Sequence, residues 1–425
     1  MTSGIDPSEA IKVFEAFESG RLDNLFTAAN TEYFDHEGFQ ALRFGVGVQR
    51  EAVWRLISAI RRSTGLLVLE SAWGDFQVHV TPTAQLMEAL YEIDTWAARS
   101  LVGRTELPAD EEWIVQDRLL VEEAVMIAMD RTGNREGDKA AIRLARAEVI
   151  ASLYDEVAPS SETGIVACRF YHAMRELPDA RSQSLTPDYI MGIHRLLSGD
   201  EPEAGQIRTT EHPVPTADSP PVSTPPARIL GELQSLHAYT ESQDIPFVHP
   251  LIKTLALAWW LRRIRPFEQH NYLVSRLVSM AYALRHGYQV AGIVGFPGRL
   301  DEHLEDSGDL TAVFINQLQV IHESKQLADA NLRERVARFH EVTTRFAPLS
   351  INHRQALILD RALRFPTTPF TIKHHARTRE LAYETARQDF IRLVDAGYLQ
   401  QRTRGKAFEF SLAPDAAKRI AKKLS

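Results

Sequence analysis

The chain has 425 residues, enough for two or three domains, and its 44% hydrophobic and 24% charged residues are typical of a soluble globular protein. The polar, acidic N-terminus lacks the features of a signal peptide, and no apolar run reaches the roughly 18 residues of a membrane span, so we expect a cytoplasmic protein. The single cysteine, Cys168, excludes an internal disulfide and a thiolate metal centre, and we expect it to be buried.

Helical patterns dominate the chain. Residues 1–108 mix helical spacing with one β-like segment, LVLESAWGDFQVHV, in which apolar and polar side chains alternate at the end. Thr83 and the acids that follow Pro108 mark two helix starts, because hydroxyl and carboxylate groups stabilise helix N-termini. Further helices are expected at residues 139–157, 163–177, 186–199, 224–239, 248–264 and 277–288. The sequence therefore predicts a mainly α-helical fold.

Residues 264–276, IRPFEQHNYLVSR, lie between two of these predicted helices. They resemble the active-site motif of the Fic (Fido) family, HPFx[DE]GNGRxxR, and keep Pro266, Phe267, Asn271 and Arg276. In that family the histidine accepts the proton of a target hydroxyl, which then attacks the α-phosphate of ATP and becomes AMPylated. The acidic residue holds magnesium, the glycines leave room for phosphates at a helix start, and the first arginine holds a phosphate.

The positions that carry this chemistry are replaced. Arg265 stands in place of the histidine, and a guanidinium stays protonated and cannot accept a proton. The neutral amide of Gln269 replaces the metal ligand, His270 and Tyr272 replace the glycines, and Leu273 replaces the first arginine. The resemblance implies a Fic-like protein with no intact catalytic residue and no metal site. ATP and magnesium, the cofactors of active relatives, are not expected here.

Other segments extend the resemblance over most of the chain. Arg208 in GQIR matches the G-x-[FI]-R element ahead of the family's flap, which binds target segments by strand pairing. Prolines in residues 212–226 remove N–H donors, so such pairing should be poorer here. In the family's inhibitory helix, Ile127 and Arg131 occupy the serine and glutamate positions, and Arg131 opposite Arg276 would be repulsive.

The resemblance implies three domains. Residues 1–108 correspond to an N-terminal helical region associated with Fic proteins, residues 109–330 to the Fic core, and residues 345–425 to a C-terminal module. This C-terminal module is basic, whereas the chain as a whole is acidic. From Ile351 to the end there are fifteen Lys or Arg and seven Asp or Glu, which gives a net charge of +8, and the whole chain has a net charge of −8. Such asymmetry favours a nucleic-acid partner for the tail.

The tail has the pattern of a winged helix-turn-helix. Ala386, Phe390, Leu393 and Val394 give one helix an inward face, Gly397 ends it, and two short strands flank a basic hairpin at Gly405. Residues that would contact DNA are those on this helix and on the hairpin, the wing, whose cations would meet phosphates. They are Tyr383, Thr385, Arg387 and Gln388 on the helix and Arg402, Arg404 and Lys406 on the wing.

Several alternatives remain open at this level. Arg265 could bind a phosphate or carboxylate or form a structural ion pair, and His270 could be a displaced base or a packing residue. Asn271 and Arg276 could hold a phosphate or tie the loop to its helix. His249 fits a helix cap, and His374 with His375 has no metal-ligand spacing. The basic tail could also be a solvated face.

We favour a pseudoenzyme without AMP-transferase activity that regulates by binding DNA, a protein, or both. The alternative is a transferase of nucleotidyl or other phospho groups with a rewired site. A third interpretation is a regulatory subunit that pairs with an intact Fic enzyme. An oligomer is compatible with all three, and none of them needs a membrane.

Overall fold

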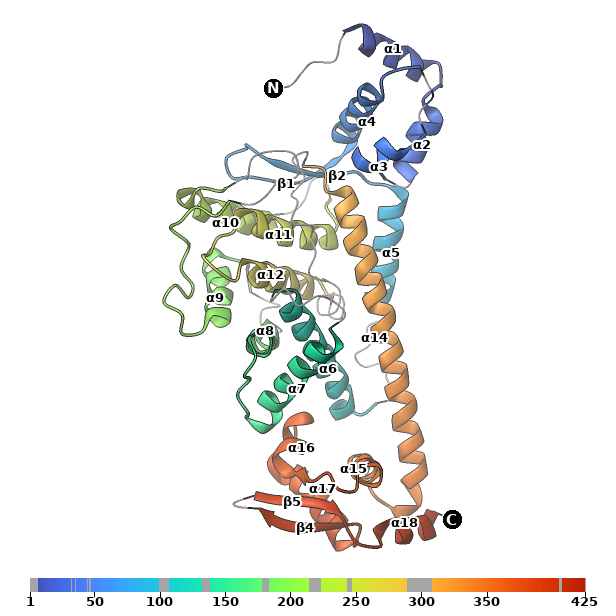
Figure 1. The fold of residues 1–425 in the computed structure, drawn as a ribbon, viewed down its shortest axis with the longest axis vertical. Helices are drawn as coiled ribbons and strands as arrows, with labels where there is room; N and C mark the ends of the chain where they lie inside the picture. The colour runs from blue at the N-terminus through green and yellow to red at the C-terminus, as the bar shows by residue number, and fades with distance from the viewer. Residues whose placement is uncertain are drawn as a thin grey trace. The chain divides into compact units, whose positions relative to one another are not determined.

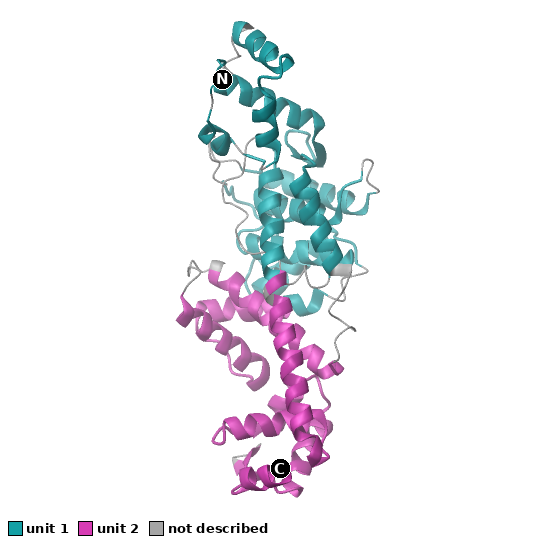
Figure 2. Ribbon diagram, turned by 90° about the vertical axis from the view of Figure 1, so that its right-hand side faces the viewer, with its two compact units in different colours: residues 1–99, 173–324 teal, residues 100–172, 325–425 magenta. Residues whose placement is uncertain are grey.

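The computed structural model describes residues 7–31, 33–34, 36–43, 45, 47–98, 107–131, 138–177, 183–213, 223–242, 247–288, 308–404 and 407–424. Most of these residues are helical, which confirms the predicted mainly α-helical fold class (Figure 1). The chain forms two compact units: residues 1–99 with 173–324 (unit 1), and residues 100–172 with 325–425 (unit 2) (Figure 2). No helix in the described ranges has both the length and the apolar content needed to cross a bilayer.

Unit 1 begins with a small helical cluster and a β-hairpin. Its helices are α1 (Pro7–Glu18), α2 (Asp23–Thr31), α3 (His36–Ala41) and α4 (Arg50–Thr64), and they enclose a core that includes Phe39, Val53 and Ile57. The β-like segment forms strands β1 (Leu66–Glu70) and β2 (Gln77–Val80), which pair antiparallel. The hydroxyl of Thr83 accepts the Leu86 N–H at 3.1 Å at the start of α5 (Ala84–Ala98), as predicted.

Unit 1 also includes the helices α9 (Pro187–Ser198), α10 (Pro226–Glu241), α11 (Pro250–Ile264) and α12 (Asn271–Arg285). Helix α11 packs against α10 and α12, and α12 packs against α9 (Figure 1). His249 caps α11 by accepting the Leu251 N–H at Nδ1, as predicted. Nearly every side chain of α11 and α12 is buried, including the polar Lys253, Arg263 and Arg276. The loop between them is therefore fixed at both ends.

Unit 2 contains α6 (Ala109–Arg131), α7 (Lys139–Asp155) and most of α8 (Glu162–Glu176). The buried carboxylate of Asp117 on α6 accepts the hydroxyl hydrogens of Tyr154 and Tyr171, and so ties these three helices together. Cys168 is buried on α8, as expected. Helix α14 (Thr311–Phe346) is continuous over 36 residues, and residue 330, proposed as a domain boundary, lies inside it.

The C-terminal module, residues 351–424, completes unit 2. Its elements are α15 (His353–Arg364), β3 (Phe370–Thr371), α16 (Ile372–Thr378), α17 (Tyr383–Asp395), β4 (Leu399–Arg404), β5 (Ala407–Leu412) and α18 (Ala416–Leu424), preceded by the short helix η2 (Ala347–Leu349). The strands form an antiparallel sheet in the order β3-β5-β4. Phe390 of α17 and Phe410 of β5 stack at a centroid distance of 4.6 Å in the core. The inward face predicted for α17 is confirmed, because Ala386, Phe390 and Leu393 are fully buried.

Candidate functional site

The segment that resembles the Fic motif forms a short loop between α11 and α12. Its first residue, Arg265, and its last, His270, have left-handed backbone conformations, with φ of 45° and 60°. Glycine adopts this conformation without steric cost, and the family motif has glycine at the position of His270. The loop therefore holds an imidazole at a backbone position that suits glycine.

Asn271 holds the loop in place through its side-chain amide. The amide oxygen accepts the Phe267 N–H at 2.9 Å, and the amide nitrogen donates to the Phe267 carbonyl at 2.6 Å. The oxygen and the nitrogen of this buried amide are thus both hydrogen-bonded to the backbone of Phe267. This geometry favours the interpretation in which Asn271 ties the loop to its helix rather than holding a phosphate.

Arg208 joins the segment before the predicted flap to the motif loop. Its guanidinium is 2% exposed and donates to the carbonyl oxygens of Arg265 at 2.6 Å and Thr224 at 2.5 Å. It also donates to the carbonyls of Ile264 and Thr210, and its backbone N–H donates to Pro266. Residues 214–222, most of the predicted flap, lie outside the described residues. Arg208 therefore anchors the base of that segment.

Arg265 and Glu268 add two further contacts between the same segments. The guanidinium of Arg265 donates to the Pro213 carbonyl at 3.2 Å. Glu268 accepts the Thr210 hydroxyl at 2.6 Å and lies 2.8 Å from Nε2 of His212. The hydrogen bond from Thr210, followed by that from His212, lowers the pKa of Glu268 to about 2, so the carboxylate is charged at neutral pH. The charged side chains at this edge of the loop are thus engaged in holding it.

Two histidines lie beside the loop. The ring of His194 stacks on Phe267 at 4.0 Å, and its Nδ1 accepts the Gly205 N–H, which places the remaining ring hydrogen on Nε2. Burial lowers the pKa of His194 to about 4, so it is neutral at pH 7. His270 directs Nε2 to the carboxylate of Glu201 at 3.1 Å. This contact supplies His270 with a partner that suits the packing interpretation.

The remaining motif residues point in different directions. Gln269 is exposed, whereas Pro266, Leu273 and Arg276 are buried. The ring of Tyr272 lies 5.2 Å from the guanidinium carbon of Arg262. Leu273, at the motif position where the family pattern has an arginine, is an apolar side chain that is 2% exposed.

These residues do not fit a magnesium ion with a triphosphate. Magnesium requires hard anionic oxygen donors, and the metal position is the exposed amide of Gln269. Within the described ranges, no cluster of three or more His, Cys, Asp or Glu is arranged to hold a metal ion. The Asn271 amide is committed to Phe267, and side chains at residues 270 and 272 occupy the glycine positions.

Three residues of this site were not identified from the sequence: His194, Glu201 and Glu268. His194 shares the inward spacing of Ile190, Ile193 and Leu197 on α9, and a histidine on such a face is a signal that could have been used. Glu268 occupies a variable position of the family motif, so the motif gave no reason to select it.

The predicted inhibitory-helix residues lie on α6. Ile127 is buried. Arg131 is the last residue of α6, and its side chain lies outside the described residues. An isoleucine in the core cannot supply the hydroxyl that the family's serine provides at this position.

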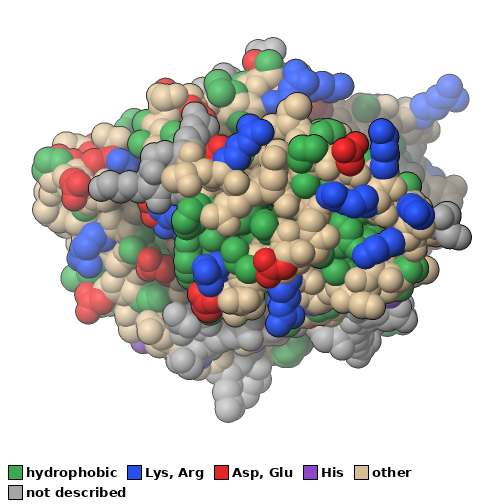
Figure 3. Space-filling model, turned by 90° about the horizontal axis from the view of Figure 1, so that it is seen from below, with side chains coloured by type: hydrophobic (Ala, Val, Ile, Leu, Met, Phe, Trp, Pro, Cys, Tyr) green, Lys and Arg blue, Asp and Glu red, His purple; other side chains and the backbone are tan. Residues whose placement is uncertain are grey.

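The predicted DNA-contacting residues lie on α17 and on the β4–β5 hairpin. Tyr383, Thr385 and Gln388 are exposed at the start of α17, and Arg402 is exposed on β4. Arg387 and Gln388 both donate to Glu384, at 3.0 and 2.8 Å. Lys406 and the side chain of Arg404 lie outside the described residues. On the lower face of the molecule, Lys and Arg side chains gather on one part of the surface (Figure 3).

No protein-family model matches the sequence, and no curated protein matches it. Several solved structures, in contrast, are similar to this chain. The fold is similar to that of Fic proteins. A Fic family protein from Desulfovibrio desulfuricans G20 is similar over 78% of this chain and 97% of its own length, at 16% identity and a TM-score of 0.46. A form of Fic-1 from C. elegans covers 66% of this chain and 75% of its own, at 16% identity and a TM-score of 0.41.

A Fic domain containing signaling protein from Bacteroides thetaiotaomicron VPI-5482 covers 58% of this chain and 98% of its own length, at 15% identity and a TM-score of 0.40. These likenesses concern the fold alone. The chemistry of the site therefore has to be inferred from the residues of this chain.

Proposed function

We propose that this chain is a Fic-fold protein that does not transfer AMP and that acts as a regulator by binding DNA. The observation that carries the first part is the environment of Arg265. The residue at the position of the proton acceptor is a permanent cation, and its guanidinium is bonded to the Pro213 carbonyl. A hydroxyl at this position would have no group to take its proton.

Nearby groups do not replace the missing base. His194 is stacked on Phe267 and buried, and His212 is paired with Glu268. His270 faces Glu201. Catalysis by a general base requires an acceptor within about 3 Å of the reacting hydroxyl, and none of these three imidazoles stands at the motif position of Arg265.

We expect no AMPylation by this protein. Incubation of the full chain with α-labelled ATP, Mg²⁺ or Mn²⁺ and cell lysate should give no labelled protein above a sample that contains heat-denatured chain. An active Fic enzyme in the same lysate provides the positive control. A labelled adduct that disappears in Arg276→Ala would show a rewired transferase instead.

The second part of the proposal concerns the C-terminal module. Its order of a helix, a short strand, two helices and a two-stranded hairpin (α15, β3, α16, α17, β4–β5) fits a winged helix, with α17 as the recognition helix. Tyr383, Thr385 and Gln388 are exposed in the first two turns of α17, whereas Ala386 and Phe390 are buried. A helix with one face in the core and a polar, aromatic face in solvent suits the major groove.

DNA binding should be weak, salt-sensitive and dependent on the wing. Arg402→Gln should lower the slope of log affinity against log salt by about 0.9, the value for one lost phosphate contact. Fluorescence anisotropy of the full chain with a mixed-sequence duplex measures this slope. Arg392→Gln, in the last turn of α17, removes the same charge on the same module and serves as the matched control. Equal slopes for the two variants, or no binding at low salt, would contradict the proposal.

A further inference from the structure

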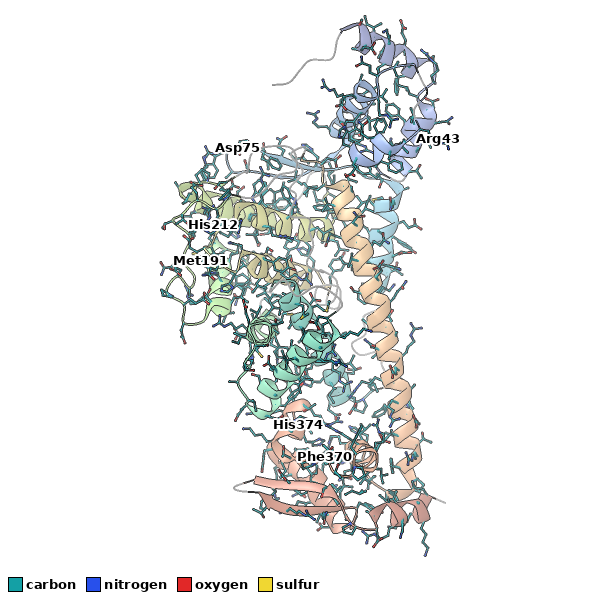
Figure 4. The ribbon with its side chains drawn as sticks, in the orientation of Figure 1. Arg43, Asp75, Met191, His212, Phe370 and His374 are labelled. Carbon is teal, nitrogen blue, oxygen red and sulfur yellow. The ribbon has the colours of Figure 1, made fainter. Side chains whose placement is uncertain are left out.

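The cations of α16 are engaged by the end of helix α7 in the same unit. The two carboxylate oxygens of Glu156 bind different cations, one the ammonium of Lys373 and the other the guanidinium of Arg377. Nδ1 of His374 lies 3.1 Å from a carboxylate oxygen of Asp155, and its position on α16 is labelled in Figure 4. We call these five residues the α7–α16 ion-pair cluster.

The backbone of α7 strengthens the negative charge at this point. A helix C-terminus carries partial negative charge, and the Tyr154 carbonyl there accepts from Arg377 at 3.4 Å. Glu156 itself ends the helix in a left-handed conformation, with its N–H bonded to the Ala151 carbonyl. Hydrogen bonds from Lys373 and then Arg377 lower the pKa of Glu156 to about 2, so it is ionised at any physiological pH. The cluster thus presents a fixed anionic group to α16.

Lys373 and Arg377 lie on α16, the helix that would contact DNA phosphates. In a helix-turn-helix the first helix of the pair crosses the DNA backbone while the second enters the major groove. Here α16 is the first helix and α17 the second. The Lys373 ammonium and the Arg377 guanidinium each bind one carboxylate oxygen of Glu156. The same two cations could bind two oxygens of one DNA phosphate in the same way.

We propose that the end of α7, through Glu156 and Asp155, competes with DNA phosphates for the cations of α16 and so holds the module in a low-affinity state. This inference rests on the DNA binding proposed above and adds its regulation. The competition is reversible because the pairs are exposed: 57% of the Glu156 side chain and 49% of the Lys373 side chain are accessible. Exposed ion pairs are individually weak and screened by salt. A duplex, with its higher density of negative charge, can displace them.

The test compares DNA affinity of full-chain variants at low salt, with the mixed-sequence fluorescent duplex as probe. Glu156→Gln should bind several-fold more tightly than the wild type, because Lys373 and Arg377 become available to phosphates. Glu334→Gln is the matched control: Glu334 is exposed on α14 in the same unit, and no ion pair among the described residues includes it. It makes the same change in net charge. Thermal melting confirms that each variant is folded.

A double-mutant cycle distinguishes release of these two cations from a general charge effect. In a chain with Lys373→Gln and Arg377→Gln, the further change Glu156→Gln should give no gain beyond that of Glu334→Gln. If wild type binds DNA and Glu156→Gln gains no more than the control, or keeps its full gain without the two cations, the competition is refuted while DNA binding stands. If no variant binds the duplex even at low salt, the proposed DNA binding fails, and the competition fails with it.

Discussion

Replacing Asp389 with alanine is expected to destabilise the C-terminal module by about 3–5 kcal/mol, the usual cost of removing one partner from a buried ion pair. The side chain is 3% exposed and lies on α17. It accepts the Asn352 amide at 3.0 Å, Nε of Arg354 at 2.6 Å and Nε2 of His375 at 3.3 Å. One carboxylate therefore connects the start of α15, helix α16 and helix α17.

Denaturant unfolding followed by circular dichroism measures the loss, and hydrogen exchange over residues 351–424 locates it. Asp395→Ala, an exposed carboxylate on the same helix, should change stability by well under 1 kcal/mol. If the two variants lose equal stability, Asp389 does not hold the module together.

The effect of Asp389 should depend on pH in one direction. Burial raises the pKa of its carboxyl, but hydrogen bonds from His375, Arg354 and Asn352 outweigh this and hold the pKa well below the ordinary value of 3.8. Because the folded-state pKa is depressed, the stabilisation is complete above pH 3.8 and is lost as the pH falls below it. The difference between wild type and Asp389→Asn should accordingly shrink in acid.

Arg208→Ala should cost unit 1 about 3 kcal/mol or more. The variant leaves the carbonyls of Arg265, Thr224 and Ile264 without their donor, and an unsatisfied buried acceptor costs roughly 1–3 kcal/mol. Hydrogen exchange should rise at residues 205–213 and 262–268, the segments that the guanidinium joins. Arg208→Lys should recover only part of the loss, since an ammonium cannot match the planar fork of a guanidinium.

The control for this prediction is Arg228→Ala. Arg228 lies in the same unit with 43% of its side chain exposed and pairs with Asp75 at 2.9 Å, an ion pair of the kind that contributes about 0–1 kcal/mol. A loss in Arg208→Ala no greater than in this control would show that the loop is held by other contacts.

The helices were predictable because their signals are local. Apolar spacing located α11 and α12, and His249 and Thr83 marked helix starts through cap chemistry that depends on neighbours two or three residues away. Alternation at the end of the β-like segment located strand β2, whereas the antiparallel pairing of β1 with β2 was not predicted. The continuity of α14 was not predicted, although its sequence has no internal Gly or Pro, because the domain boundary at residue 330 was set by resemblance.

The site was predictable only in part. The motif located the loop residues in the sequence, and the identity of Arg265 alone excluded a proton acceptor at the position of the family's histidine. The partners of those positions were not predictable: Glu201 beside His270, Pro213 beside Arg265 and Asp155 beside His374 are brought together by tertiary packing across long stretches of sequence. For the same reason the positive charge of the tail overstated what is available to DNA, because acids of α7 neutralise part of it.

The contacts that hold the motif loop in place do not involve the side chains at its exposed positions. Asn271, Arg208 and Phe267 hold the backbone path through amide, guanidinium and ring contacts, none of which requires a nucleotide. Exposed positions of the loop, such as that of Gln269, can therefore vary without unfolding the scaffold around them. Because these contacts lie within unit 1, the loop keeps its path whatever role its exposed side chains serve.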